Sequence, residues 1–337
     1  MINHQLFDKS LYPGSSTPKN PKVSVCLITY NHEDFIRTCL DSILSQITNF
    51  EFEIIIGEDG STDKTAAIVK EYAEKYPTKI KAFIRSKNIS AKLNYLHTFF
   101  SAKGEYIINI EGDDYFTDPE KLQIQADFLD KHQQFSACYH NAWMKFEDGS
   151  GIADYLINPE NQKEITHTAD FLVEKETWFM ATASVMMRRK YVSTLPNWFL
   201  KSKSGDIPLY AILTEYAPIA YINRVMSVYR RHLDGSSFTD NNQSIDFLKN
   251  RIFMYSKINE YTNKKYKHLI HSILGEYYLM MLKTNEIKNK WLFKCYYFLM
   301  AFYLLPKNSN QLLKDSFKES LMTNFIKKIL KIYLIFR

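Results

Sequence analysis

Apolar and polar residues in the first third of the chain follow two alternating patterns. Because a strand covered on both faces shows no polar alternation, continuous apolar runs predict strands over 23–28, 52–56, 80–85 and 106–110. Between them, apolar residues at spacings of three and four predict amphipathic helices over 33–46, 63–76 and 91–102. Strands and helices that alternate through short connections predict an α/β fold, with a Rossmann-like, mostly parallel twisted sheet flanked by helices.

The C-terminal part of the chain shows helical patterns instead. Aromatic residues and lysines at helical spacing predict helices over 245–284. The apolar run 291–305 predicts a buried or interfacial helix, because it is short for a membrane span and contains Lys294. The expected organisation is a polar lead-in, an α/β domain and a C-terminal helical extension, over 1–20, 21–240 and 241–337.

Residues 325–337 combine a basic face with a broad apolar remainder. Lys327, Lys328 and Lys331 fall on one narrow face of a helix. This pattern is typical of a helix that lies on an anionic membrane surface. A closing helix that packs onto the core is the alternative.

Composition and charge narrow the class of protein. The 337 residues are 45% hydrophobic and 24% charged, which is typical of a folded soluble protein. The net charge is +6, and the first 240 residues contain no dense basic run with interleaved aromatics, so no nucleic-acid partner is expected. Four widely spaced cysteines without a CxxC motif, and a start without a secretory signal, predict a cytoplasmic protein. The basic C-terminal helix would place it peripherally on the inner face of the membrane.

Polar residues follow three of the predicted strands at the point where each strand ends. They are Thr29, Tyr30 and Asn31 after the first, Glu58 and Asp59 after the second, and Glu111, Asp113 and Asp114 after the fourth. The carboxyl ends of parallel strands lie at one edge of a sheet, where ligands bind. Three carboxylates held so close repel unless a cation lies between them, and their hard oxygens suit Mg²⁺ or Mn²⁺. An ordinary acidic turn is the alternative for Glu111–Asp114 alone.

The turn after the first strand excludes two phosphate-binding motifs. Neither GxGxxG nor GxxxxGK[ST] follows residue 28, where the chain reads Thr-Tyr-Asn-His. A carboxylate-bound cation would then have to meet the charge of a diphosphate. The ring of Tyr30 and the carboxylate of Asp59 remain available to contact a base and a ribose.

Three motifs together resemble the family-2 glycosyltransferases, which have the GT-A fold. They are Val-Ser-Val-Cys-Leu-Ile-Thr-Tyr-Asn-His, Gly-Glu-Asp-Gly-Ser-Thr-Asp-Lys-Thr and Lys-Gly-Glu-Tyr-Ile-Ile-Asn-Ile-Glu-Gly-Asp-Asp-Tyr-Phe-Thr-Asp-Pro, and the resemblance is strong over 21–135 and thinner to about 240. It implies inverting, metal-dependent hexosyl or N-acetylhexosaminyl transfer from a nucleotide-diphosphate sugar, with a UDP-sugar favoured. It also implies a glycan or lipid-linked acceptor, in the synthesis of a bacterial surface polysaccharide such as lipopolysaccharide or capsule.

The resemblance also implies roles for residues at the strand ends. Asp59 matches the aspartate that contacts the nucleobase, and Tyr30 lies near the same base. Glu111-Gly112-Asp113-Asp114 matches the DxD-type motif, so that Asp113 and Asp114 would hold ribose and metal-diphosphate. Asn88 and Lys92 match an element that lies under the diphosphate, with Ser90 in place of its usual glycine.

Two later segments extend the resemblance. Gly205-Asp206-Ile207-Pro208-Leu209 places Asp206 where the family has its catalytic base; a simple helix N-cap is the alternative for this residue. Tyr229-Arg230-Arg231-His232 resembles the family's Tyr-Arg-x-His stretch. Arg230 and His232 alternate along an extended segment and so face one side, where they would contact the leaving diphosphate and the metal.

Two other functions are compatible with the alternating sheet. A sugar-phosphate nucleotidyltransferase can share the fold and the metal, but would carry a glycine-rich, arginine-containing loop after the first strand. A non-catalytic membrane assembly module with the same fold is the second alternative, and it would show no metal-dependent nucleotide binding.

Overall fold

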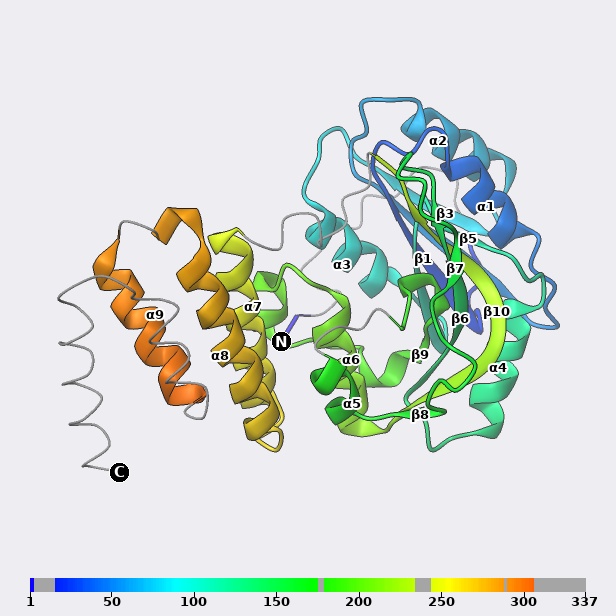
Figure 1. Cartoon of the computed structure of the whole chain (residues 1–337). Coiled ribbons are helices and arrows are strands. Elements are labelled where there is room, and N and C mark those ends of the chain that lie inside the picture. The colour runs from blue at the N-terminus through cyan, green and yellow to red at the C-terminus, as the bar shows by residue number, and fades with distance from the viewer. Residues whose placement is uncertain (3–15, 175–178, 234–243, 288–289, 306–337) are drawn as a thin grey trace. The chain divides into compact units, whose positions relative to one another are not determined.

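The computed structural model describes residues 1–2, 16–174, 179–233, 244–287 and 290–305 (Figure 1). The chain forms two compact units, residues 1–237 and 238–337. The carboxylates, the histidines and the polar strand ends discussed above all lie in the first unit.

The predicted parallel sheet is confirmed. Its strands lie in the order β3-β2-β1-β4, with bounds β1 Val23–Thr29, β2 Phe52–Glu58, β3 Ile80–Ile84 and β4 Tyr106–Glu111. The predicted crossover helices are α1 Ile36–Leu44, α2 Thr65–Lys75 and α3 Ala91–Ser101. Because β1 pairs with both β2 and β4, the polar residues that follow these three strands meet at one edge of the sheet.

Helix α1 begins later than the sequence pattern predicts, at Ile36 instead of Glu33. Glu33 instead joins the turn before α2, because its backbone N–H donates to Asp63 (3.0 Å) and its carboxylate accepts from the N–H of Lys64 (2.8 Å). This exchange ties the loop after β1 to the loop after β2. The residues between β1 and α1 are thereby held at the edge of the sheet and are not drawn into a helix.

The second half of the sheet is mixed. The order continues β4-β9-β6-β10-β5, with β5 Tyr115–Phe116, β6 Ala137–Phe146, β9 Met186–Arg188 and β10 Ile219–Arg231; β7 Tyr155–Leu156 pairs with β6, and β8 Ile165–Thr166 with β10. Strand β9 runs antiparallel to β4 and β6, while β10 runs parallel to β6. Strand β10 also pairs with β5, so its C-terminal end returns beside Glu111–Asp114.

Helices cover both faces of the sheet, which explains why its strands are apolar throughout. In Figure 1, α1, α2 and α4 (Lys121–Lys131) lie on one side, with α3 and α6 (Asp206–Tyr216) on the other. Alternate residues such as Val25, Ile54 and Ile108 belong to a continuous buried core with the first set of helices. Cys26 points the other way, toward the carbonyl of Thr98 in α3. Remaining elements of this unit are α5 Thr168–Glu174 and short 3₁₀ turns at Thr182–Ser184, Arg189–Tyr191 and Asn197–Lys201.

The second unit consists of helices in its described part. They are α7 Ile245–Tyr261, α8 Lys267–Lys283, a 3₁₀ turn at Asn285–Ile287 and α9 Trp291–Leu304, which confirms the helices predicted over 245–284 and 291–305. Leu292, Phe293, Tyr296 and Tyr303 of α9 are exposed, and Phe298 and Ala301 are buried. Among the described residues, no helix has the length and apolar character that crossing a bilayer requires. The basic helix predicted over 325–337 lies outside the described residues.

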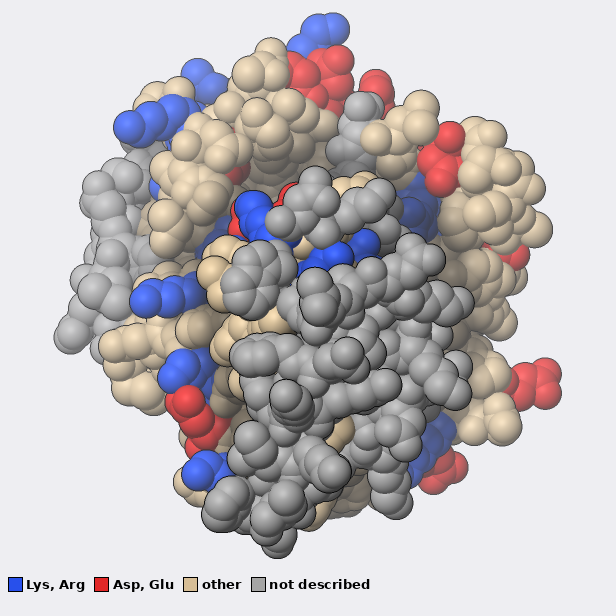
Figure 2. Space-filling view, turned by 60° about the vertical axis from the view of Figure 1, so that its left-hand side comes forward, with Lys and Arg blue, Asp and Glu red and all other residues tan. Residues whose placement is uncertain are grey.

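Charges on the drawn face of the molecule are mixed. Figure 2 shows the described lysines and arginines of this face in separate small groups with acidic residues among them.

Candidate active site

The turn Glu111–Asp114 is fastened to the neighbouring strand β1. The N–H of Gly112 donates to the carbonyl of Ile28 (2.9 Å). A Cβ on Gly112 would lie 2.6 Å from Thr29 Oγ1 and 2.9 Å from His32 Nδ1, so a larger residue would push the loop after β1 away. Glycine in the middle of the acidic motif therefore brings His32 close to the carboxylates.

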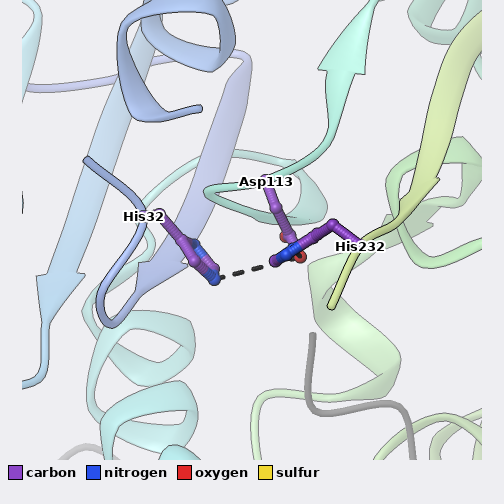
Figure 3. A group of neighbouring side chains, drawn as sticks. All are labelled: His32, Asp113 and His232. Atoms are coloured by element: carbon purple, nitrogen blue, oxygen red, sulfur yellow. Dashed lines mark hydrogen bonds and ion pairs between the residues drawn. The ribbon is translucent and has the colours of Figure 1, made fainter. Parts of the chain in front are cut away.

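Three side chains from three strand ends point toward one another (Figure 3). His232 Nε2, beyond β10, lies 3.0 Å from Asp113 Oδ2, beyond β4. His32 Nε2, beyond β1, lies 3.9 Å from the same oxygen. One ligand atom of each residue lies within 4.8 Å of the other two, so the group could hold a metal ion.

The predicted metal ligands divide between two roles. Asp113 and His232 belong to the cluster, as predicted. Asp114 does not belong to it: its side chain is buried, and Oδ1 accepts a hydrogen bond from the backbone N–H of Arg230 (2.9 Å). Asp114 therefore fastens the end of β10 to the motif. His32 was missed, although its position directly after a strand end was a signal that could have identified it.

Unpartnered polar atoms support the fit of a divalent cation. Asp113 Oδ1, Asp114 Oδ2 and His232 Nδ1 are buried and have no hydrogen-bond partner among the described residues. Buried polar atoms in native proteins are nearly always paired with protein or water. Carboxylate oxygen and imidazole nitrogen are both ligands of divalent metal ions. The donor set can thus hold a divalent cation, and the resemblance implies that this cation is Mg²⁺ or Mn²⁺.

The acidic residues of the site strongly shift one another's pKa values. Burial, then the charges of Asp113 and Asp206, raise the pKa of Glu111 to about 8. Burial, followed by the charges of Asp113 and Glu111, raises the pKa of Asp114 well above its ordinary value. Burial opposes the ionisation of Asp113 too, but the hydrogen bond from His232 and the charge of His32 hold its pKa below the usual range. Asp113 is therefore the carboxylate that is ionised before any cation binds.

Arg230 supports the same cluster from β10. Its Nη1 donates to the carbonyl oxygen of Asp113 (2.8 Å), and its guanidinium lies 5.1 Å from the ring centroid of Phe35 and 4.6 Å from that of Tyr115. It also pairs with Glu147 (3.4 Å). Arg230 and His232 thus both face Asp113, as their alternation predicts, and Arg230 fixes the backbone that presents this carboxylate.

The predicted nucleotide-binding residues at the ends of β1 and β2 form one connected surface. Tyr30 is 42% exposed, which leaves its ring accessible to a planar ligand. Asn31 has a positive φ of 55°; its N–H donates to Ser61 Oγ (2.9 Å), and its Oδ1 accepts from the N–H of Thr62 (2.9 Å). Thr29, the last residue of β1, is buried. Asn31 is therefore a bridge between the two strand ends.

Glu58 has a different role from the predicted one. It is fully buried, and its carboxylate accepts from the backbone N–H groups of Ser61 (2.7 Å) and Gly60 (3.3 Å). Both oxygens are used inside the turn that follows β2. Glu58 consequently shapes this turn and does not present its oxygens to a ligand.

Asp59 anchors the loop that contains Asn88. Its Oδ1 accepts from the N–H of Ile89 (2.9 Å), and burial raises its pKa. Asn88 is exposed, and its Oδ1 accepts from the N–H of Ser90 (2.9 Å). Ser90 has a φ of 91°, where the family resemblance expects glycine. The two predicted residues are thus brought together by one hydrogen-bonded loop.

The charge of Asp206 acts on both Lys92 and Glu111. Asp206 is the first residue of α6, and Gly205 occupies the N-cap position, so the interpretation of Asp206 as the N-cap residue is wrong. Lys92 donates to the carbonyl of Ser204 (3.0 Å) and lies 4.5 Å from the ring centroid of Phe199. Burial lowers the pKa of Lys92 to about 8, although the charge of Asp206 opposes this. Lys92 therefore holds the loop that leads into Asp206.

A surface hollow of about 370 Å³ lies elsewhere, lined by Glu105, Arg188 and Arg189 among others. Glu105 precedes β4 and Glu111 ends it, so this hollow is at the opposite end of the strand from the carboxylates. We therefore assign the site from its converging polar groups.

The chain is similar to known proteins in both sequence and fold. Residues 24–195 match the family model described as glycosyl transferase family 2. The "Uncharacterized protein Rv1520" of Mycobacterium tuberculosis is 35% identical over 228 residues, which cover 65% of this chain and 62% of that protein. The chain thus spans less than two thirds of the length of this relative.

Another relative is the poly(ribitol-phosphate) beta-N-acetylglucosaminyltransferase TarS of Staphylococcus aureus. It is 33% identical over 146 residues, which cover 43% of this chain and 24% of TarS. The crystal structure of S. aureus TarS 1–349 in complex with UDP-GlcNAc matches with a TM-score of 0.59 and 18% identity, over 86% of this chain and 83% of that one. This similarity shows a common fold.

Proposed function

Because this chain belongs to glycosyl transferase family 2 and has the GT-A fold, we propose that it transfers a sugar from a nucleotide-diphosphate sugar to an acceptor hydroxyl. The observation that carries the proposal is the convergence of Asp113, His232 and His32 at the strand ends, where buried polar atoms have no partner among the described residues. Asp113 and His232 would hold Mg²⁺ or Mn²⁺, which when bound supplies positive charge for the diphosphate.

The nucleotide half of the donor would bind on the neighbouring strand ends. Tyr30 offers an accessible ring for stacking on a base. The hydrogen bond from the backbone N–H of Ile89 fixes the carboxylate of Asp59, which would accept a hydrogen bond from the base. A uridine nucleotide is favoured because the structural relative TarS was solved with UDP and with UDP-GlcNAc. The name of TarS, a beta-N-acetylglucosaminyltransferase, also favours an N-acetylhexosaminyl group as the sugar.

Asp206 would be the catalytic base of a direct displacement. The acceptor hydroxyl attacks the anomeric carbon while the Asp206 carboxylate takes its proton, and the bond from that carbon to the diphosphate oxygen breaks. One displacement inverts the configuration. The influence of the Asp206 charge on the pKa of Glu111 supports its closeness to the motif, and Lys92 would position its loop.

The acceptor would belong to a bacterial surface glycan, such as lipopolysaccharide or capsule, and would be a glycan or a lipid-linked glycan. TarS, by its name, acts on a cell-surface polymer of poly(ribitol-phosphate), which supports this general class. We also propose that the chain binds peripherally to the inner face of the membrane. The exposed Leu292, Phe293 and Tyr296 of α9, next to Lys294, support an interfacial location.

Two substitutions test the proposal. Asp113→Asn should abolish metal-dependent UDP binding, measured by calorimetry with and without MnCl₂, because it removes the ionised carboxylate of the cluster. Asp206→Asn should keep UDP affinity but lower transfer from a panel of UDP-sugars by about 10²- to 10⁴-fold. Asp246→Asn, at an exposed position in the first turn of helix α7, is the matched control and should change neither quantity.

Two results would contradict these roles. Unchanged metal-dependent UDP binding by the Asp113→Asn variant would exclude Asp113 from the metal site. Loss of UDP binding together with transfer in the Asp206→Asn variant would indicate that Asp206 is structural.

A further inference from the structure

The third member of the cluster, His32, lies outside the residues that the motifs assign to metal binding. It comes from the loop after β1, and its backbone N–H donates to Thr65 Oγ1 at the start of α2 (2.8 Å). Its side chain is about one sixth exposed, and its Nε2 points toward Asp113 (Figure 3). Because its backbone is anchored, the imidazole reaches the cluster from a fixed position.

The contacts of the other ring nitrogen set the orientation of His32. Nδ1 lies 3.3 Å from Thr29 Oγ1. When the Nδ1–H donates to this hydroxyl, the lone pair of the neutral ring lies on Nε2, which faces Asp113. Histidines that bind metals usually have their other nitrogen held by such a hydrogen bond, which fixes both the tautomer and the ring orientation.

The distance from His32 to Asp113 suits a shared ion better than a direct hydrogen bond. His32 Nε2 and Asp113 Oδ2 are 3.9 Å apart, which is too long for a hydrogen bond. Ligands that each lie roughly 2.1–2.3 Å from one ion are separated by roughly 3–4.5 Å. The group shows separations of 3.0 Å, 3.9 Å and at most 4.8 Å. Only small side-chain movements are needed to surround a cation.

We propose that His32 is a direct metal ligand together with Asp113 and His232, and that this imidazole-rich set makes the site select Mn²⁺ over Mg²⁺. The inference rests on the proposed function for the role of the ion as a partner of the donor diphosphate. Mg²⁺ prefers oxygen ligands, whereas imidazole favours transition-metal ions. A site with two nitrogens and one carboxylate oxygen should therefore prefer Mn²⁺ over Mg²⁺ more strongly than a site made of carboxylates alone.

Electron paramagnetic resonance of the full chain with MnCl₂, alone and with UDP, tests this inference directly. In the wild type we expect Mn²⁺ to be bound more tightly than Mg²⁺, and spin-echo modulation to show two directly bound ¹⁴N nuclei. His32→Gln should weaken Mn²⁺ binding by at least about tenfold and remove one of the two nitrogen couplings. His167→Gln, an exposed histidine after β8, is the matched control and should leave both unchanged.

A second variant protects the test against a folding defect. His32→Asp places an oxygen ligand at the same position and should narrow the preference for Mn²⁺ over Mg²⁺ while UDP still binds. If His32→Gln and His32→Asp both bind Mn²⁺ with wild-type affinity and couplings, the inference fails while the proposed function stands. If the wild type binds neither Mn²⁺ nor UDP, the proposed function fails, and the inference fails with it.

Discussion

Replacing Ser90 with glycine is expected to stabilise the first unit of the chain. Ser90, at the N-cap of α3, has φ 91° and ψ 141°. Residues other than glycine rarely adopt this backbone conformation. The loop is held in this conformation from both sides, because Ile89 donates to Asp59 and Ser90 donates to Asn88. The strain is therefore imposed by the contacts that shape the proposed donor site.

The expected gain is the difference of three contributions. Relief of the backbone strain is worth about 1–3 kcal/mol. Loss of the Ser90 side-chain cap, whose Oγ accepts from Leu93 N–H at a long 3.5 Å, costs about 0.5 kcal/mol. The greater conformational freedom of glycine in the unfolded chain costs a further ~0.4–1 kcal/mol. The free energy of unfolding should thus rise by about 1 kcal/mol. For a unit of this size, such a change raises the melting temperature by about 2–4 °C.

Urea unfolding followed by tryptophan fluorescence measures this gain. Trp143 and Trp198 are the described tryptophans of the first unit. Ser90→Ala is the matched control: it keeps the positive φ and loses the cap, so it should be less stable than the wild type by about 0.5 kcal/mol. If Ser90→Gly proves no more stable than Ser90→Ala, the backbone of residue 90 is not strained and the reasoning is refuted.

Two further predictions concern a buried lysine and the membrane. Lys121 is fully buried, donates to Gln125 Oε1 (2.7 Å), and has a pKa lowered by burial to about 7. This native pKa is below the unfolded value of 10.5, so burial of the charged lysine destabilises the folded state by up to about 5 kcal/mol. The whole of this destabilisation is present below pH 7, and it disappears as the pH rises toward 10.5. Lys121→Met should therefore raise the free energy of unfolding more at pH 6 than at pH 9.5 in urea titrations; an equal change at both would contradict the low pKa. The full chain should cosediment with vesicles that contain phosphatidylglycerol more than with neutral phosphatidylcholine vesicles, and replacing Lys327, Lys328 and Lys331 by glutamine should weaken this binding. Equal binding to both kinds of vesicle would argue against an electrostatic membrane contact.

Local pattern alone was enough to predict the parallel half of the fold. Buried strands such as 23–29 and 106–111 are apolar on both faces because helices cover both faces, and their neighbours are amphipathic because each helix covers one of them. The positions of Asp59 and Asp113 followed from the rule that ligands bind at the carboxyl ends of strands, and the role of Asp206 came from the family resemblance of its motif. Such features depend on residues close together in the chain, so the amino-acid sequence determines them directly.

Tertiary structure decided which of these side chains meet. The two- and three-residue strands β5 and β9 have no periodicity of their own, and only their pairing with β10 and β4 brings His232 beside Asp113. His32 joins them because β1 and β4 are neighbours and Gly112 leaves room for the imidazole. Glu58 turns inward because the N–H groups of its own turn need an acceptor. Contacts between residues far apart in the chain depend on packing, which local pattern does not encode.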